Sequence, residues 1–238
     1  MKFNTKISDT KNGEHAIYGK KVTELMKTHT FTDVIFLLYA GALPTDDERS
    51  VLDALLVAAA EHGIETPSGY VPRVSAASGN SVHTAMAAGM LAMGEAHGGA
   101  GEAAALMLLR DESPDVIVAE YAALKKNIPG FGHPLYKDED PRAAIIYVKA
   151  KAAGKKLKTF APFEKAYAIE AALAQAKGKK LPLNIDGAFA AAILALGMPP
   201  AAAKAIFVLA RTAGMGAHAL EELAQNNGYK RLDPTPIS

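Results

Sequence analysis

Cysteine is absent from the 238-residue sequence, which excludes a disulfide framework, a thiolate metal site and a cysteine nucleophile. An excess of either charge is also absent, because 26 Lys and Arg residues stand against 25 Asp and Glu residues, for a formal net charge of +1. A nearly neutral chain lacks the basic footprint of a protein that binds nucleic acid or an anionic membrane. We therefore expect neither as a partner.

Long hydrophobic runs are missing as well. The longest uncharged stretch, residues 187–203, is interrupted by Gly197, Pro199 and Pro200, so it does not reach the roughly 18 to 20 apolar residues of a membrane-spanning helix. Residues 1–10 lack the apolar stretch of a secretory signal. Together with the absence of cysteine, these features predict a soluble, cytoplasmic protein.

Alternating β-branched stretches are nearly absent, whereas alanine-rich segments with apolar residues three and four apart dominate. This pattern predicts an all-α fold of one large domain or two intimate ones. We expect no helix over residues 70–80, where Ser and Gly interrupt the pattern. Capping and stop signals predict helices over residues 46–62, 81–93, 114–124, 164–176, 187–196 and 204–225, the last broken or bent near Gly214 and Gly216.

His97 stands among glycines between Gly94 and Gly101. The backbone N–H groups of Gly98 and Gly99 could open the next helix and suit an anion or a carbonyl oxygen. The alternative interpretation is a glycine that ends the preceding helix, with an incidental histidine.

His133 lies in the segment Asn-Ile-Pro-Gly-Phe-Gly-His-Pro-Leu-Tyr-Lys, residues 127–137, with Asp140, Pro141 and Arg142 just beyond. Proline, glycine and aromatic residues predict a stiff loop that a ligand can approach closely, while His133, Lys137 and Arg142 supply donors for a carboxylate or a phosphate. The alternative is a turn with a capping histidine.

Asp186 is a lone carboxylate at the start of a strongly apolar helix, and Arg211 is a lone guanidinium on another. Asp186 could be the N-cap of its helix or a general base. Arg211 could form an internal salt bridge or bind an acidic substrate, because a buried guanidinium needs an anionic partner.

Metal and nucleotide motifs are missing. His62, His83 and His218 are single histidines without the spacing of a zinc site, and no glycine pattern matches a Rossmann, P-loop or serine-hydrolase motif. We expect no metal ion.

Taken in order, these motifs resemble those of the citrate synthase superfamily: a His-Gly turn at His97, a Pro-Gly-Phe-Gly-His loop ending in Asp-Pro-Arg, and an Asn-Ile-Asp helix start at Asp186. The resemblance implies an all-α fold with a large domain (residues 1–97 and 191–238), a small domain (residues 98–190) and the active site in the cleft between them. It also implies a homodimer or a higher homo-oligomer.

The same resemblance implies the role of each site residue. Asp186 is then the general base at the acetyl-CoA methyl group, His97 the donor to the thioester oxygen and His133 the donor to the oxaloacetate carbonyl. The remaining roles are substrate binding by His62, Arg142, Arg211 and, from the neighbouring subunit, Arg231, and coenzyme A binding by Ile128, Pro129, Gly130, Phe131, Gly132 and Lys137. Coenzyme A enters as a thioester substrate beside a small dicarboxylate or tricarboxylate, and no permanently bound cofactor is expected.

The direction of the reaction is a separate question. Only seventeen or so residues separate Thr45 from His62, and this shortness resembles citryl-CoA lyases and the lyase module of ATP-citrate lyase. We expect a citryl-CoA lyase that forms acetyl-CoA and oxaloacetate. His97 is nevertheless synthase-like, and Pro134 replaces the arginine common after the loop histidine. A citrate synthase, a lyase for a related thioester such as citramalyl-CoA, and a non-catalytic CoA-binding scaffold remain alternatives.

Overall fold

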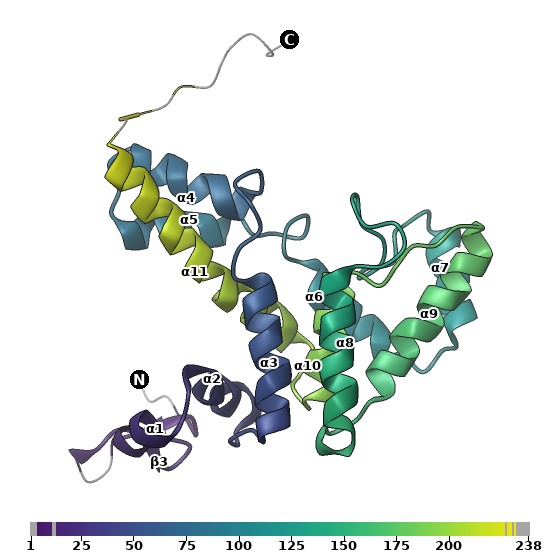
Figure 1. Ribbon diagram of the computed structural model, residues 1–238, viewed down its shortest axis with the longest axis horizontal. Coiled ribbons are helices and arrows are strands. Elements are labelled where there is room, and N and C mark those ends of the chain that lie inside the picture. Colours follow the sequence, from purple (N-terminus) through teal and green to yellow (C-terminus); the bar gives the residue numbers. More distant parts are fainter. Residues whose placement is uncertain (1–3, 11–12, 227, 230, 232–238) are drawn as a thin grey trace. The chain divides into compact units, whose positions relative to one another are not determined.

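The computed structural model describes residues 4–10, 13–226, 228–229 and 231. Helices dominate it (Figure 1), which confirms the all-α prediction. A small antiparallel sheet near the N-terminus has two-residue strands in the order β1 (Ser8–Asp9), β2 (Ala16–Ile17) and β3 (Lys20–Lys21). Within the described part of the chain, no helix combines the length and the apolar character needed to cross a bilayer.

The helices follow in chain order: α1 (Val22–Thr28), α2 (Phe31–Ala40), α3 (Asp46–Ala59), α4 (Pro67–Ala77), α5 (Val82–Leu91), α6 (Ala100–Leu108), α7 (Pro114–Ala123), α8 (Pro141–Ala153), the 3₁₀ helix η2 (Gly154–Lys156), α9 (Ala161–Lys177), α10 (Ile185–Ala195) and α11 (Ala201–Gln225).

Local capping signals were good predictors of helix starts. Thr45 and Glu48 form the expected reciprocal box at α3, with the Thr45 N–H donating to Glu48 Oε2 at 2.8 Å and the Glu48 N–H donating to Thr45 Oγ1 at 3.2 Å. Ser113 caps α7 by accepting from the Val116 N–H. These interactions span three residues, so the sequence alone contains them.

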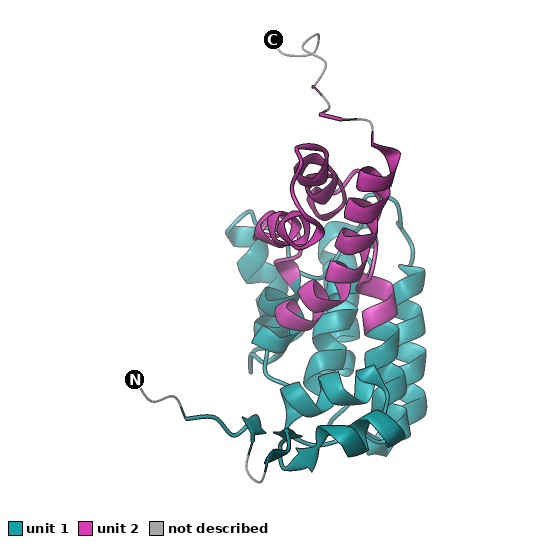
Figure 2. Cartoon of the chain, turned by 90° about the vertical axis from the view of Figure 1, so that its left-hand side faces the viewer, with its two compact units in different colours: residues 1–55, 101–203 teal, residues 56–100, 204–238 magenta. Residues whose placement is uncertain are grey.

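The chain forms two compact units (Figure 2): unit 1 comprises residues 1–55 and 101–203, and unit 2 comprises residues 56–100 and 204–238. The domain division expected at residues 97 and 191 stays a prediction. In unit 1, α10 packs against α8 and α9, and α9 packs against α7. Helix α10 is buried on every side from Gly187 to Ala195, and burying side chains such as Phe189 and Ile193 contributes about 1.5–3 kcal/mol each.

Unit 2 corrects two expectations about helices. Residues 70–80, for which we expected no helix, lie largely in α4, which continues through Pro72. Helix α11 continues through Gly214 and Gly216, so the break that was one of the two expectations there, a break or a bend, does not occur. The glycines permit close approach, since a Cβ at Gly214 would lie 2.6 Å from Ala60 O. The small side chains of Ala76, Ala85 and Ala219 form a buried cluster where α4, α5 and α11 meet.

Candidate active site

The loop 127–132 is fastened to the start of α10 in unit 1. The Gly132 N–H donates to Pro182 O at 2.8 Å, and the Asn184 N–H donates to Gly130 O at 3.0 Å. Gly130 has a φ of +88°, and a Cβ at Gly187 would lie 2.4 Å from Gly130 O. Both positions therefore require glycine, and their close approach sets the loop beside the first turn of α10.

Asp186 lies in that first turn but is not its N-cap. The N-cap is Asn184, whose Oδ1 accepts the N–H groups of Asp186 at 3.0 Å and Gly187 at 3.2 Å. The N-cap interpretation of Asp186 is therefore wrong, because another side chain performs the capping. The half-buried Asp186 carboxylate instead lies at the positive end of the helix dipole, which stabilises negative charge.

His133 is oriented by its own loop. The N–H groups of Leu135 and Tyr136 donate to His133 Nδ1 at 3.1 and 3.2 Å, and the Tyr136 ring stacks on the imidazole with 4.7 Å between centroids. Burial and then the charge of Arg142 lower the pKa of His133, against weaker opposing effects of Asp140 and Asp186. The imidazole is therefore neutral near pH 7, and because Nδ1 accepts, its proton is on Nε2.

With its proton on Nε2, His133 presents an N–H donor toward Arg142. Arg142 Nη2 lies 3.4 Å from His133 Nε2, so two N–H donors face the same space. Neither can accept from the other, and an oxygen acceptor between them would satisfy both. The pair suits a carbonyl or carboxylate oxygen, which argues against the interpretation of His133 as a simple capping residue.

Asp140 connects this donor pair to α10. Its side chain is completely buried; Oδ1 accepts from Arg142 Nε at 3.0 Å, and Oδ2 accepts from Arg142 Nη2 at 2.8 Å and from the Ile185 N–H at 3.0 Å. Burial raises the pKa of Asp140, but hydrogen bonds and ion pairing with Arg142 outweigh it and hold the pKa below its usual value. Sequence reasoning gave Asp140 no role, although an Asp before Pro at a helix start is a capping signal.

A polar cluster in unit 2 is built around Ser68, which is 1% exposed. Its Oγ lies 2.9 Å from His97 Nε2, and its N–H also donates to that nitrogen at 3.3 Å. Burial, followed by the charges of Arg211 and His62, lowers the pKa of His97. The neutral imidazole therefore accepts at Nε2 and carries its proton on Nδ1. The interpretation of His97 as an incidental residue does not account for these contacts.

Arg211, which is 4% exposed, joins the same cluster from α11. Its Nη1 donates to Ser68 Oγ at 2.9 Å and its Nε donates to Ala59 O at 2.6 Å, while the guanidinium lies over the Phe207 ring, 5.1 Å from the centroid. Helix α3 ends at Ala59, before the expected end at residue 62, and Arg211 satisfies one of its last carbonyl groups. No pattern in the sequence identified Ser68, which lies 143 residues from Arg211.

The exposed His62 belongs to a turn that is tied to α11. The Gly214 N–H donates to Ala60 O at 3.1 Å, and His218 Nε2 lies 2.9 Å from Glu61 Oε1. The Glu61 carboxylate also accepts the Gly63 N–H at 2.8 Å. The charge of His62 is one of the causes that lower the pKa of His97, so the two histidines lie near each other in unit 2.

The remaining predicted residues are more dispersed. Ile128, Phe131 and Gly132 line a cavity of about 300 Å³ in unit 1. The exposed Lys137 donates to His133 O at 3.2 Å. Arg231 lies beyond the end of α11 and is exposed, so its predicted contribution to a neighbouring subunit stays a prediction.

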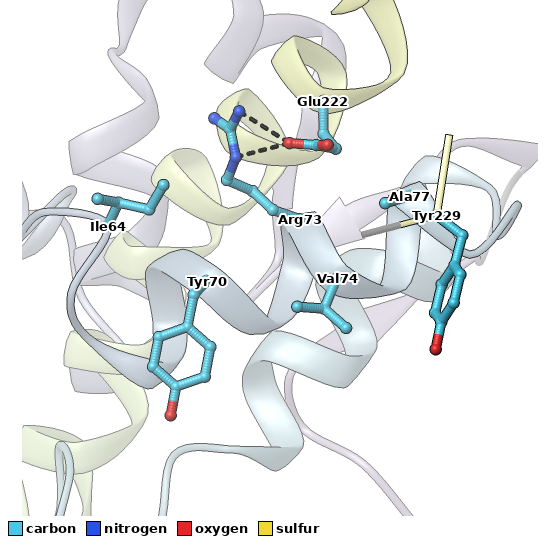
Figure 3. A pocket seen from close by; sticks show the side chains of 7 residues that line it. All are labelled: Ile64, Tyr70, Arg73, Val74, Ala77, Glu222 and Tyr229. Atoms are coloured by element: carbon cyan, nitrogen blue, oxygen red, sulfur yellow. Dashed lines mark hydrogen bonds and ion pairs between the residues drawn. The ribbon is translucent and has the colours of Figure 1, made fainter. Parts of the chain in front are cut away.

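A second cavity, of about 170 Å³, lies in unit 2 beside α4 and the end of α11 (Figure 3). Arg73 lines this cavity, and its Nε donates to Glu222 Oε2 at 2.8 Å. The apolar part of the lining includes Ile64, Tyr70 and Val74. None of the predicted site residues lines this cavity. Among the described residues, no group of three or more His, Asp or Glu side chains is arranged to hold a metal ion.

Ser68→Ala should remove the hydroxyl group that links His97 to Arg211 by hydrogen bonds. The substitution leaves Arg211 Nη1 without its Ser68 acceptor, and losing one partner of a buried hydrogen bond costs about 1–3 kcal/mol. Urea unfolding should show this loss, while Ser78→Ala, which removes an exposed hydroxyl bonded to Val74 O, should change stability by less than about 0.5 kcal/mol. Equal effects of the two variants would contradict the bridging role of Ser68.

Comparison with solved structures first assigns the fold. Citryl-CoA lyase from Hydrogenobacter thermophilus superposes with a TM-score of 0.91 and 36% identity, covering 99% of this chain and 93% of that one. The protein therefore has an all-α fold like that of citrate synthase. Residues 45–232 match the family described as citrate synthase, C-terminal domain. The chain belongs to the citrate synthase family, which confirms the resemblance found in its motifs.

Relatives with assigned activities include synthases. A 2-methylcitrate synthase of Shewanella oneidensis is 32% identical over 196 residues, which are 79% of this chain and 51% of that protein. A citrate synthase of Haloferax volcanii is 31% identical over 212 residues, which are 83% of this chain and 55% of that protein. The chain thus spans about half the length of these curated relatives.

Proposed function

We propose that the protein cleaves citryl-CoA to acetyl-CoA and oxaloacetate. The observation that carries this proposal is the 36% identity and the TM-score of 0.91 with a citryl-CoA lyase, over nearly the whole of both chains. The polar groups around His133 and Asp186 in unit 1, and those around His97 in unit 2, supply donors and a carboxylate of the kinds that the reaction needs.

The donor pair of unit 1 suits the oxaloacetate end of the substrate. In citryl-CoA the carbinol oxygen loses its proton to a solvent water molecule, its electron pair forms the carbonyl group of oxaloacetate, and the bond to the neighbouring methylene carbon breaks. His133 Nε2 and Arg142 Nη2, 3.4 Å apart, can both donate to this oxygen and the adjoining carboxylate. Such preorganised donors stabilise the charge that develops on oxygen.

The electrons of the broken bond pass to the thioester, which becomes an enolate. His97 carries its proton on Nδ1, because Nε2 accepts from Ser68, and can donate it in a hydrogen bond to the enolate oxygen. The carboxylic acid form of Asp186 then delivers a proton to the methylene carbon and yields the acetyl group. Asp186 is left as a carboxylate and regains from solvent the proton that the carbinol released, so the protons balance and no cofactor is consumed.

Substrate binding uses the remaining predicted residues. We assign the coenzyme A moiety to the loop 128–132 with Lys137, and the substrate carboxylates to Arg142, Arg211, His62 and Arg231. Coenzyme A is a substrate in this proposal, and no permanently bound cofactor takes part. A homodimer, a cytoplasmic location and the absence of nucleic-acid and membrane partners stay predictions.

Two parallel assays test the direction of the reaction. Purified protein incubated with citryl-CoA should form acetyl-CoA and oxaloacetate. Incubated with acetyl-CoA and oxaloacetate, it should release little free CoA, because a synthase must also hydrolyse the citryl thioester with a positioned water. Free CoA released at a rate comparable with citryl-CoA cleavage would contradict the lyase proposal.

A citrate or 2-methylcitrate synthase is the second candidate. Its support is the identity of 32% and 31% to proteins with these activities. Sustained release of free CoA from acetyl-CoA or propionyl-CoA with oxaloacetate would favour it. Absence of turnover with every thioester, combined with binding of CoA, would instead favour a non-catalytic scaffold.

A further inference from the structure

Three contacts in unit 2 hold residues 59–61, which lead into His62, against α11. They are the hydrogen bond from Arg211 Nε to Ala59 O at 2.6 Å, the hydrogen bond from the Gly214 N–H to Ala60 O at 3.1 Å, and the contact of 2.9 Å between His218 Nε2 and Glu61 Oε1. Residues 211, 214 and 218 are three and four positions apart, so these contacts follow one face of the helix. The segment that precedes His62 is therefore placed by α11.

The Glu61 side chain folds back onto the backbone that carries His62. Both of its carboxylate oxygens accept the Gly63 N–H, at 2.8 Å each. Burial raises the pKa of Glu61, but hydrogen bonds from His218 and from the N–H groups of Gly63 and His62 outweigh it and hold the pKa below its ordinary value of 4.5. The carboxylate is therefore ionised at neutral pH, and it binds the two peptide N–H groups that flank the Cα atom of His62.

His218 keeps this carboxylate in place. An ionised carboxylate only accepts hydrogen bonds, so the Nε2 atom of His218 carries the proton in the contact with Glu61. The His218 side chain is 18% exposed, whereas the Glu61 side chain is 51% exposed. Without the His218 N–H, water would replace this contact, and the half-exposed Glu61 side chain would be free to adopt other rotamers.

The backbone that follows His62 is fixed as well. Gly63 has a φ of +86°, and its carbonyl oxygen accepts the Thr66 hydroxyl at 3.0 Å. A Cβ at Gly69 would lie 2.4 Å from the same oxygen, so α4 approaches this carbonyl group closely. His62 thus lies between two fixed segments of backbone, and Glu61 contacts the peptide groups on both sides of it.

We propose that Glu61 and His218 are positioning residues that orient His62 toward a carboxylate of the citryl thioester. The inference rests on the proposed function, which assigns His62 to substrate binding. Glu61 and His218 act through His62 and need no contact with the substrate themselves. Fixing the backbone of a binding residue in advance lowers the entropy that binding would otherwise cost.

A mutant cycle between His218 and His62 tests this role in citryl-CoA cleavage. His218→Phe keeps an aromatic ring but removes the N–H donor, and it should raise KM on the order of 10-fold with kcat changed by less than about two-fold. His218→Gln keeps an N–H donor and should recover most of the wild-type KM. In the His62→Ala background, His218→Phe should raise KM no further, because its effect passes through His62.

His83→Phe is the matched control for the His218 variant. His83 is an exposed histidine in the first turn of α5, with its Nδ1 3.1 Å from Ser81 Oγ, so its replacement also removes an imidazole from unit 2. It should leave KM at the wild-type value. Equal increases in KM from His218→Phe with and without His62 would overturn the inference. A lower Tm of His218→Phe with KM unchanged would do the same, because His218 would then contribute to stability alone.

Amide hydrogen exchange tests the positioning without any substrate. His218→Phe should speed the exchange of the His62 and Gly63 N–H groups on the order of 10-fold, because both groups bind the Glu61 carboxylate. His83→Phe should leave their exchange unchanged. Exchange at the wild-type rate in His218→Phe would overturn the inference, whatever the activity.

A failure of the proposed function gives a different result. If wild-type protein does not cleave citryl-CoA, the lyase proposal fails, and the same cycle is measured as calorimetric binding of citrate. Faster exchange at His62 and Gly63, together with losses of citrate affinity that are not additive between His218→Phe and His62→Ala, would still support the inference. Additive losses of affinity would overturn it.

Discussion

Asp186→Asn is expected to slow the chemical step of citryl-CoA cleavage by a factor on the order of 10² to 10⁴. Asparagine keeps the shape of the side chain but has no carboxylic acid proton to deliver to carbon. The start of α10 should persist, because its N-cap is Asn184. Single-turnover rates measure the chemical step, and calorimetry should show CoA binding little changed.

Asp115→Asn is the matched control for this variant. Asp115 is an exposed carboxylate in the first turn of α7, so its replacement also removes a favourable charge from a helix N-terminus, worth about 0.3–1 kcal/mol. It should leave the chemical step unchanged. An Asp186→Asn rate within a factor of three of the wild-type rate would exclude Asp186 as the residue that delivers the proton.

Asp140→Asn is expected to lower the free energy of unfolding by about 3 kcal/mol at pH 7, because removing one member of a buried ion pair leaves the other uncompensated. The pKa of Asp140 in the folded protein lies below its ordinary value of 3.8. Its ionised form therefore stabilises the fold above that value, and the contribution is lost as the pH falls through the folded pKa. Urea unfolding should show the free energies of unfolding of the wild type and the variant converging as the pH falls below the ordinary carboxyl pKa of 3.8.

The double variant Asp140→Asn/Arg142→Gln completes a mutant cycle for the pair. Because the two side chains share hydrogen bonds, the double variant should be more stable than the sum of the two single losses implies, by about 1–3 kcal/mol. Additive losses in the free energy of unfolding would contradict the proposed ion pair. So would a difference in this free energy between wild type and Asp140→Asn that is the same at pH 7 and pH 3. In the single variant Asp140→Asn, Arg142 should also bind the substrate carboxylate less well, so KM should rise.

The sequence by itself determined the helical fold, several of the helix starts and the local motifs of the candidate site. Thr45 with Glu48 and Ser113 with Val116 are capping pairs three residues apart, so the physical cause of each helix start lies within one turn of the chain. The loop before His133 and the Asp-Pro-Arg sequence are equally local. These motifs led to the citrate synthase family, and the match over residues 45–232 confirms it.

Only the tertiary structure decided which polar groups form hydrogen bonds with one another. Gly214 predicted a break or a bend in α11, but the helix runs through it and the glycine accommodates the close approach of Ala60 O. Ser68 joins His97 to Arg211 across 143 residues, and Asp140 joins Arg142 to Ile185. Buried donors and acceptors must be paired, and their partners are set by the packing of distant segments, which no local pattern contains.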